Sequence, residues 1–285
     1  MGQLRALVGL RWQMVRSPRV RVGLLLLALA LPLLVVLAGT AGQVARSASL
    51  SFNVLLLSPT LFLGFAVLAV VAPLSSGGGN ELFPPEQLVA FPVRPATTYL
   101  ASLLSAPLNL AWATQVVSLA AATSFIADRG PLVLLSLTTT LAYIALATTA
   151  GQAIGWWVVG ARQSALGRHL TTGLGIAVLV TAVGVVAAGR TVSLLDRSPT
   201  TAVTIAAVQG SQGRLLPWAG TTFVLVVATA VALWSGTRAA GWALRRPSEA
   251  VRAISSRRQR RRPSPRGNVR TLLRADRASV WRSTP

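Results

Sequence analysis

The chain has 285 residues and a net charge of +21, 53% of its residues are hydrophobic, and all 27 basic residues are arginine. It contains no cysteine and one histidine, which excludes disulfides, cysteine-zinc sites, thiol nucleophiles and a His-Glu-x-x-His metal site. Because it contains no lysine, it cannot form the phosphate-binding loop of an ATPase. We therefore predict that the protein is not an enzyme and has no catalytic site, metal site or cofactor of its own.

The first 21 residues alternate arginine with apolar side chains. The arginines are Arg5, Arg11, Arg16, Arg19 and Arg21. A basic amphipathic helix of this kind lies in the plane of a membrane surface. We predict a basic interfacial helix over 1–21. The apolar run that follows is expected to be retained as a span rather than cleaved as a signal peptide, because it is long and five more spans follow it.

The apolar residues come in runs of about 20, which is the length needed to cross a hydrocarbon layer about 30 Å thick. These runs predict an all-α integral membrane protein with a six-span domain over 22–243. The predicted spans are about 22–42, 50–74, 98–127, 132–159, 170–189 and 218–243. No aspartate or glutamate falls inside them, which argues against a proton- or sodium-driven carrier.

The longest polar interruption before residue 190 is the segment 75–97, between the second and third predicted spans. Its glycines release the chain from the second span, and Pro84-Pro85 suit the start of a short helix. Leu88 and Phe91 would lie together on that helix, because they are three residues apart. Glu81 and Glu86 are two of only six acidic residues in the chain. The segment is either a docking loop for a basic partner surface or a solvated loop whose acids aid solubility.

Polar residues within the predicted spans are few. Asn109, Gln115 and Gln152 either line a path or form hydrogen bonds between helices. The spacing Gly151-x-x-x-Gly155 allows two helix backbones to approach closely. The predicted span ends are marked by Trp156, Trp157, Trp218 and Trp242, which we expect to anchor the helices at the membrane surface.

The segment 190–217 precedes the last span and is only weakly apolar between Thr200 and Val208. It is too short to cross the membrane. It either lies on the outer surface or dips into the membrane and returns.

The chain after the last span, 244–285, is strongly basic. The arginines of 257–262 are expected to meet anionic lipid rather than nucleic acid, because they follow a span closely. Leu10–Pro18 and Arg274–Pro285 are both arginine-rich segments with a tryptophan that end in proline. We therefore interpret 244–285 as a cytoplasmic tail or as a linker to a missing second half.

Arginine counts predict the orientation. With the N-terminus inside, the segments 1–21, 75–97, 161–169 and the C-terminal part from Arg238 onward hold 22 of the 27 arginines. The outer links hold five. The positive-inside rule therefore places both termini in the cytoplasm of a multi-pass cell-membrane protein.

The sequence of the loop 75–97 resembles a loop found in a known protein family. Gly78-Gly79-Asn80-Glu81-Leu82, followed by Leu88 and then Phe91-Pro92-Val93-Arg94-Pro95, resembles the coupling loop of ABC-2 type transporter permeases, and is closest to the actinobacterial-style members. The resemblance implies a six-span permease subunit that moves its substrate outward when a separate ABC-type ATP-binding subunit hydrolyses ATP. It also implies short re-entrant helices before the last span.

The resemblance further implies which residues contact the ATPase. These are Asn80, Glu81, Leu82, Glu86, Leu88, Phe91, Pro92 and Arg94. A second permease half or a homodimer would complete the transporter, with lipids and no nucleic acid as further partners. Lipids, drugs, hydrophobic peptides and polymer precursors all suit an apolar path. The alternative function is a non-transport membrane scaffold or regulatory subunit with a lipid-binding tail.

Overall fold

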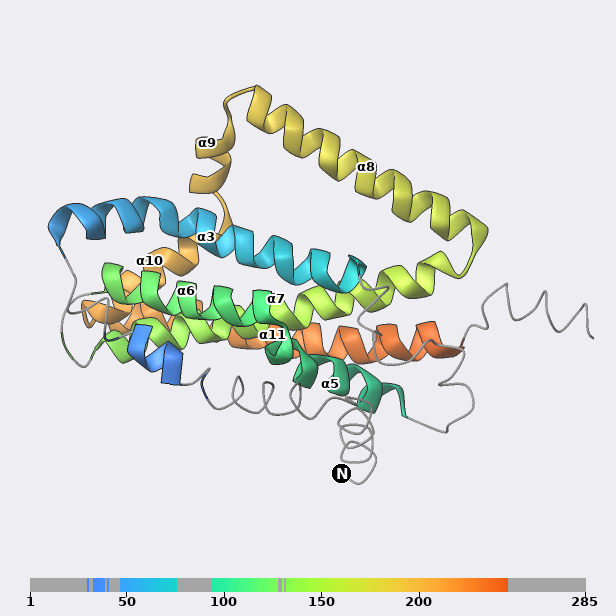
Figure 1. The fold of residues 1–285 in the computed structure, drawn as a ribbon, viewed down its shortest axis with the longest axis horizontal. Helices are drawn as coiled ribbons and strands as arrows, with labels where there is room; N and C mark the ends of the chain where they lie inside the picture. Colours follow the sequence, from blue (N-terminus) through green and yellow to red (C-terminus); the bar gives the residue numbers. More distant parts are fainter. Residues whose placement is uncertain are drawn as a thin grey trace, which may run out of the picture. The chain divides into compact units, whose positions relative to one another are not determined.

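The structure, a computed structural model, describes residues 30, 33–38, 40, 47–75, 94–127, 130 and 132–245 (Figure 1). Within these residues the regular secondary structure is helical throughout and contains no strand. The helices are α3 (Ala48–Ser75), α5 (Pro95–Ser105), the 3₁₀ helix η1 (Ala106–Leu108), α6 (Leu110–Ile126), α7 (Val133–Arg162), α8 (Ala165–Ala187), α9 (Thr191–Asp196), α10 (Pro199–Ser211) and α11 (Leu215–Arg245). The all-α prediction is confirmed for this part of the chain.

Four of these helices are long and apolar enough to cross a membrane. They are α3, α7, α8 and α11, and α5 with α6 provides a fifth if the bent pair is one span. Several long apolar helices are what a multi-pass membrane protein requires. Of the predicted first span, 33–38 are helical, and most of its other residues lie outside the described ones. The predicted interfacial helix 1–21 and the tail from residue 246 also lie outside them.

The predicted boundaries of three spans agree with the helix ends to within three residues. Only α8 differs more, because it begins at Ala165 instead of residue 170. Ser164 explains the earlier start. Its Oγ accepts a hydrogen bond from the backbone N–H of Gly167 at 3.1 Å, which caps the first turn of the helix.

The predicted third span, 98–127, is interrupted. α5 and α6 are bent by 63° where η1 joins them. Pro107 lies in η1 and lacks a backbone N–H, so a regular helix cannot continue through it. Asn109 then starts α6 anew, because its Oδ1 accepts from the N–H of Ala111 at 2.9 Å. The predicted third span therefore consists of two helices, which form either one broken span or a re-entrant loop.

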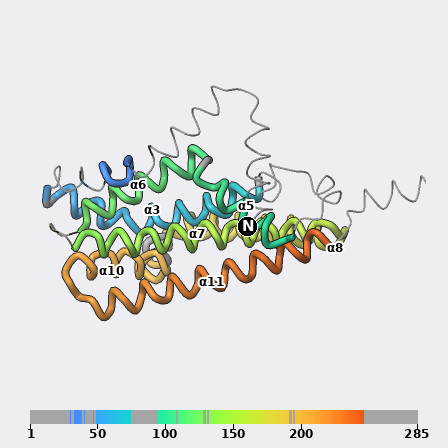
Figure 2. The backbone as a smooth tube through the Cα atoms, turned by 90° about the horizontal axis from the view of Figure 1, so that it is seen from below, coloured from blue at the N-terminus to red at the C-terminus, as the bar shows by residue number. Residues whose placement is uncertain are grey.

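Helix α7 is the centre of the described bundle. It contacts α3, α5, α6, α8, α10 and α11, and Figure 2 shows it between α3 and α6 on one side and α10 and α11 on the other. A Cβ added at Gly151 would lie 2.0 Å from the carbonyl oxygen of Ala69, so only glycine lets α7 and α3 come this close. The close approach predicted from the glycine spacing is confirmed at Gly151.

Hydroxyl groups join α7 to its neighbours. The Tyr143 hydroxyl donates to the carbonyl of Phe62 in α3 at 2.6 Å, and the Tyr99 hydroxyl of α5 donates to the carbonyl of Thr149 at 2.9 Å. Two threonine pairs, Thr123–Thr140 at 2.8 Å and Thr139–Thr222 at 3.0 Å, connect α7 to α6 and α11. Interhelical bonds of this kind contribute about 0.6 kcal/mol each in a membrane protein.

Helix α10 packs one face on the bundle, whereas Ala202 and Ile205 on its other face are exposed. It contacts α3, α7 and α11, and buries Val203, Ala206 and Ala207 almost completely. Thr204 receives a hydrogen bond from Ser58 of α3 at 3.2 Å, and Ala207 accepts one from Ser136 of α7. The two arrangements open for 190–217, on the outer surface or dipping into the membrane and returning, both stay predictions.

Candidate functional site

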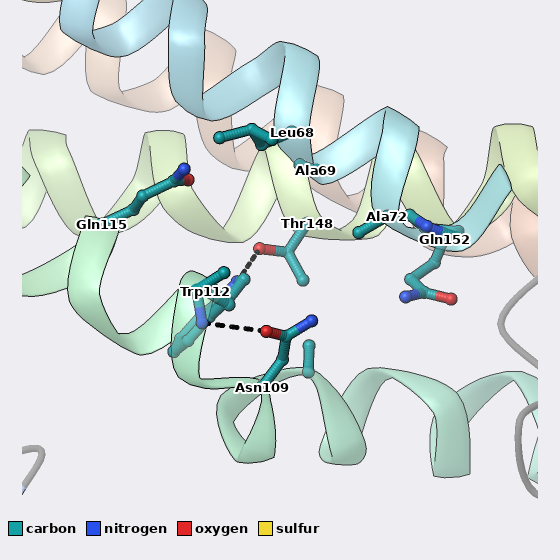
Figure 3. Close-up of a pocket in the computed structure, with 11 residues that line it drawn as sticks. Leu68, Ala69, Ala72, Asn109, Trp112, Gln115, Thr148 and Gln152 are labelled. Carbon is teal, nitrogen blue, oxygen red and sulfur yellow. Dashed lines mark hydrogen bonds between the residues drawn. The ribbon is translucent and has the colours of Figure 1, made fainter. Parts of the chain in front are cut away.

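A small cavity lies where α5 and α6 are interrupted, against α3 and α7. Its volume is about 80 Å³, which is room for a few water molecules. Its polar lining residues are Asn109, Trp112, Gln115, Thr148 and Gln152 (Figure 3). Leu68, Ala69, Ala72 and Pro73 of α3 supply most of the apolar wall, with Ala106 and Ala111.

The sequence produces this space in two ways. The break at Pro107 bends the chain away from a straight helical path, and Ala106 and Ala111 on either side of it have side chains too small to fill the bend. Gly151 holds the α7 backbone against Ala69, which fixes α3 beside the cavity. The cavity therefore follows from the backbone bend and from small side chains, and it is open on one side, where Leu68, Ala72 and Ala111 are exposed.

Three of the polar lining residues form hydrogen bonds. The Trp112 indole N–H donates to the Thr148 hydroxyl at 2.9 Å, which links α6 to α7 across the cavity (Figure 3). Asn109 uses its carbonyl oxygen to cap α6. Gln152 differs, since its Oε1 is buried and accepts no hydrogen bond from any described residue. An unpaired buried acceptor costs about 1–3 kcal/mol, so water or a polar ligand group is expected to meet it.

Among the described residues that line the cavity, none has an acidic or basic side chain. It offers amide, hydroxyl and indole groups, which bind water or neutral hydrogen-bonding groups. Its residues cannot exchange protons at neutral pH. These groups can recognise a polar part of a molecule.

The structure brings together all three residues predicted from the sequence to line a path. Asn109, Gln115 and Gln152 face the same cavity from α6 and α7. The sequence analysis missed Trp112 and Thr148. Spacing puts Trp112 on the side of Asn109 and Gln115, and Thr148 on the side of Gln152, but an indole and a hydroxyl are too ordinary in a membrane helix to single out. That the cavity belongs to a transport path stays a prediction.

The predicted coupling loop is described only at its end. Asn80, Glu81, Leu82, Glu86, Leu88, Phe91 and Pro92 lie outside the described residues. Arg94 is exposed and immediately precedes α5, and its carbonyl oxygen accepts from the N–H of Thr97 at 2.9 Å. Pro95 occupies the first helical position, where its missing N–H costs nothing.

The four tryptophans predicted as interfacial anchors have different surroundings. Trp157 and Trp242 form a ring pair with centroids 5.3 Å apart near the C-terminal ends of α7 and α11. Trp156 is only 1% exposed and packs in the core against α11. Trp218 donates its indole N–H to the carbonyl of Leu135 at 2.9 Å. The anchor prediction is therefore wrong for Trp156, and Trp218 joins two helices.

One charged residue lies inside a predicted span. Arg238 belongs to α11, although the arginine count assigns it to the C-terminal segment. Its side chain is exposed, and its Cζ lies 4.8 Å from the centroid of the Trp234 ring.

Comparison of the chain with protein-family models, curated proteins and solved structures finds no match.

Proposed function

We propose that the chain is the membrane permease subunit of an ATP-driven exporter of the ABC-2 type, with six spans, both termini in the cytoplasm and a separate ATPase bound to the loop 75–97. The position of α10 is the observation that carries this proposal. The resemblance implies short re-entrant helices before the last span, and α10 is a short helix packed among α3, α7 and α11 directly before α11.

The loop is well placed to transmit movement. α3 ends at its start and α5 begins at its end, and both helices pack on α7. Gly151 of α7 packs closely against Ala69 of α3, and the Tyr99 hydroxyl of α5 donates a hydrogen bond to the Thr149 carbonyl of α7. A force on the loop would therefore reach α7 through two tight contacts. The cavity lies between these contacts and the α5–α6 break, where a bend can change with little loss of packing.

The absence of acidic residues from the predicted spans fits an energy source outside the chain. The cavity of about 80 Å³ is smaller than most transported molecules, so a substrate would require these helices to move apart or a second half to complete the path. Apolar walls with a few amide groups suit an amphipathic substrate. Lipids, drugs, hydrophobic peptides and polymer precursors all belong to that class.

The test is affinity purification of the full chain from native membranes in mild detergent, with mass spectrometry of co-purified proteins and an ATP hydrolysis assay. We expect a P-loop ATPase to co-purify. Glu86→Arg should lower its recovery about tenfold, because a charge reversal at a docking contact costs on the order of 1.4 kcal/mol or more.

Asp196→Arg is the matched control. Asp196 is exposed in α9, on the side predicted to be outside, so its reversal should leave ATPase recovery unchanged. Equal recovery with Glu86→Arg and the unaltered chain would show that Glu86 does not dock the ATPase. Failure to recover any ATPase, even after crosslinking, would favour the scaffold function instead.

A further inference from the structure

Arg238 lies in α11, seven residues before the last residue of the helix. At 1.5 Å per residue, the 31 residues of α11 extend over about 46 Å, close to the thickness of a bilayer with its headgroups. Arg238 is then about 10 Å from the C-terminal end of the helix. This depth corresponds to the boundary between the hydrocarbon and the headgroups.

The side chain of Arg238 lies on the face of α11 that points away from the bundle. Val227, Val231, Trp234 and Arg238 follow one another at helical spacing, and all are exposed. Gly236, Ala239, Ala240 and Ala243 are buried on the opposite face. In a membrane, the outward face meets lipid or another protein.

The charge of Arg238 has no acidic partner in the part of the chain that the structure describes. Asp196 is the sole acidic residue there, and it lies in α9, which packs on α3 and α10. The guanidinium instead stacks on the Trp234 ring at 4.8 Å. An arginine at this depth needs a negative group, because an uncompensated charge in the hydrocarbon is costly.

Tryptophans also mark this end of α11 and of α7. Trp234 and Trp242 lie one turn before and one turn after Arg238 on α11. Trp157 of α7 pairs with Trp242, and its N–H donates to the Ser235 hydroxyl at 3.1 Å. Indole rings pack well at the level of the glycerol and the upper acyl chain, and a guanidinium binds a phosphate through two parallel hydrogen bonds.

We propose that Arg238, with Trp234 and Trp242, binds the phosphate group of an anionic phospholipid in the leaflet that meets the C-terminal end of α11. A second copy of the chain fits this face less well, because none of its six acidic residues falls within a predicted span. The arrangement offers a phosphate group a cation at the boundary between hydrocarbon and headgroups, with the Trp234 ring against the guanidinium. The proposal does not depend on the transport function.

The experiment measures quenching of tryptophan fluorescence in reconstituted full-length protein, using phosphatidylglycerol or phosphatidylcholine with brominated chains. Trp234 is 60% exposed and Trp157 44% exposed, so both report on bound lipid. The measurement is made at about 1 M salt, where the Debye length of about 3 Å weakens attraction to the arginines of the tail. We expect the unaltered protein to prefer phosphatidylglycerol.

Arg238→Gln should lower this preference about fivefold, and Arg238→Lys should retain part of it, because lysine keeps the charge but loses the paired hydrogen bonds. Arg214→Gln is the matched control, since Arg214 is exposed just before the opposite end of α11. An unchanged preference in Arg238→Gln would overturn the proposal, as would an equal loss in Arg214→Gln. A change of oligomeric state in Arg238→Gln with lipid preference intact would assign the face to a protein partner instead.

Discussion

Helices α7 and α8 follow one another across a two-residue turn, and both are long and apolar enough to span a membrane. Their environments differ sharply. α7 has thirteen buried residues, whereas α8 has one, Gly167. The buried face of α7 is made of hydroxyl and small residues, including Ser136, Thr139, Thr140 and Gly151. α8 has mainly valine, leucine and isoleucine in its second half.

The difference shows what makes a membrane helix pack on other helices. Apolar side chains are as well solvated by lipid as by protein, so they do not select a helix for the interior. Small residues let backbones approach, and hydroxyls gain partners there. α7 therefore becomes the centre of the described bundle, although its hydropathy is no greater than that of α8.

The largest expected effect comes from a bulky residue at the closest contact of α7. Gly151→Leu would place its Cβ 2.0 Å from the Ala69 carbonyl oxygen, so α3 must move away. We expect a loss of about 3 kcal/mol or more, measured by thermal unfolding of the protein in detergent. Gly173→Leu in α8 is the control, since nothing lies within 4 Å of a Cβ there. Similar melting temperatures for both variants would show that α7 is not packed more tightly at Gly151 than α8 is at Gly173.

Gly160→Ala and Gly175→Ala should change stability in opposite directions. A Cβ at Gly160 would lie 2.2 Å from the Trp242 ring, and displacing that ring should cost about 1–3 kcal/mol. At Gly175 the space is open, and alanine should stabilise α8 by up to about 1 kcal/mol through its better helix propensity. The measurement is the shift of the unfolding midpoint. A gain in both variants would mean that Trp242 moves aside freely.

The smallest expected effect concerns single hydroxyls. Thr139→Val removes the 3.0 Å bond to Thr222 while keeping the side-chain shape, and should destabilise the protein by about 0.6 kcal/mol. Thr181→Val in α8, where the side chain is exposed, should change stability by less than about 0.5 kcal/mol. A double-mutant cycle with Thr222→Val separates the bond from other effects. A coupling energy of zero would show that the hydroxyl pair does not connect α7 and α11.

The sequence predicts an element best where the residues of that element alone decide its structure. Apolar runs predicted α3, α7 and α11 to within three residues, because hydropathy and length alone decide whether a helix suits a membrane. The same reasoning started α8 too late, since it read Arg168 and His169 as a polar link rather than as the first turns of a helix capped by Ser164. It also placed one span over 98–127 without the break at Pro107, which the local rule for proline would have predicted.

In the candidate site, too, some residues stand out in the sequence and others are recognised only from contacts between helices. Asn109, Gln115 and Gln152 stand out in the sequence as polar residues within apolar runs. Trp112 and Thr148 do not, because an indole and a hydroxyl are ordinary in a membrane helix, and only the contact between α6 and α7 makes them partners. Trp156 and Trp157 are neighbours in the sequence, yet one is buried and the other 44% exposed. Their position along the chain cannot distinguish them. The two side chains point in different directions from α7, and which of these directions is buried depends on the face that α11 covers.

The sequence by itself determined the helical character of the described part of the chain, the positions of its long helices and the small-residue spacing at Gly151, because each follows from local composition and period. Only the tertiary structure decided that one face of α10 packs on α3, α7 and α11, that a cavity forms beside Gln152, and that Arg238 faces outward beside Trp234. The physical reason is that hydropathy determines whether a helix is stable in a membrane. Close packing of small residues and hydrogen bonds between polar groups determine which other helices it packs against.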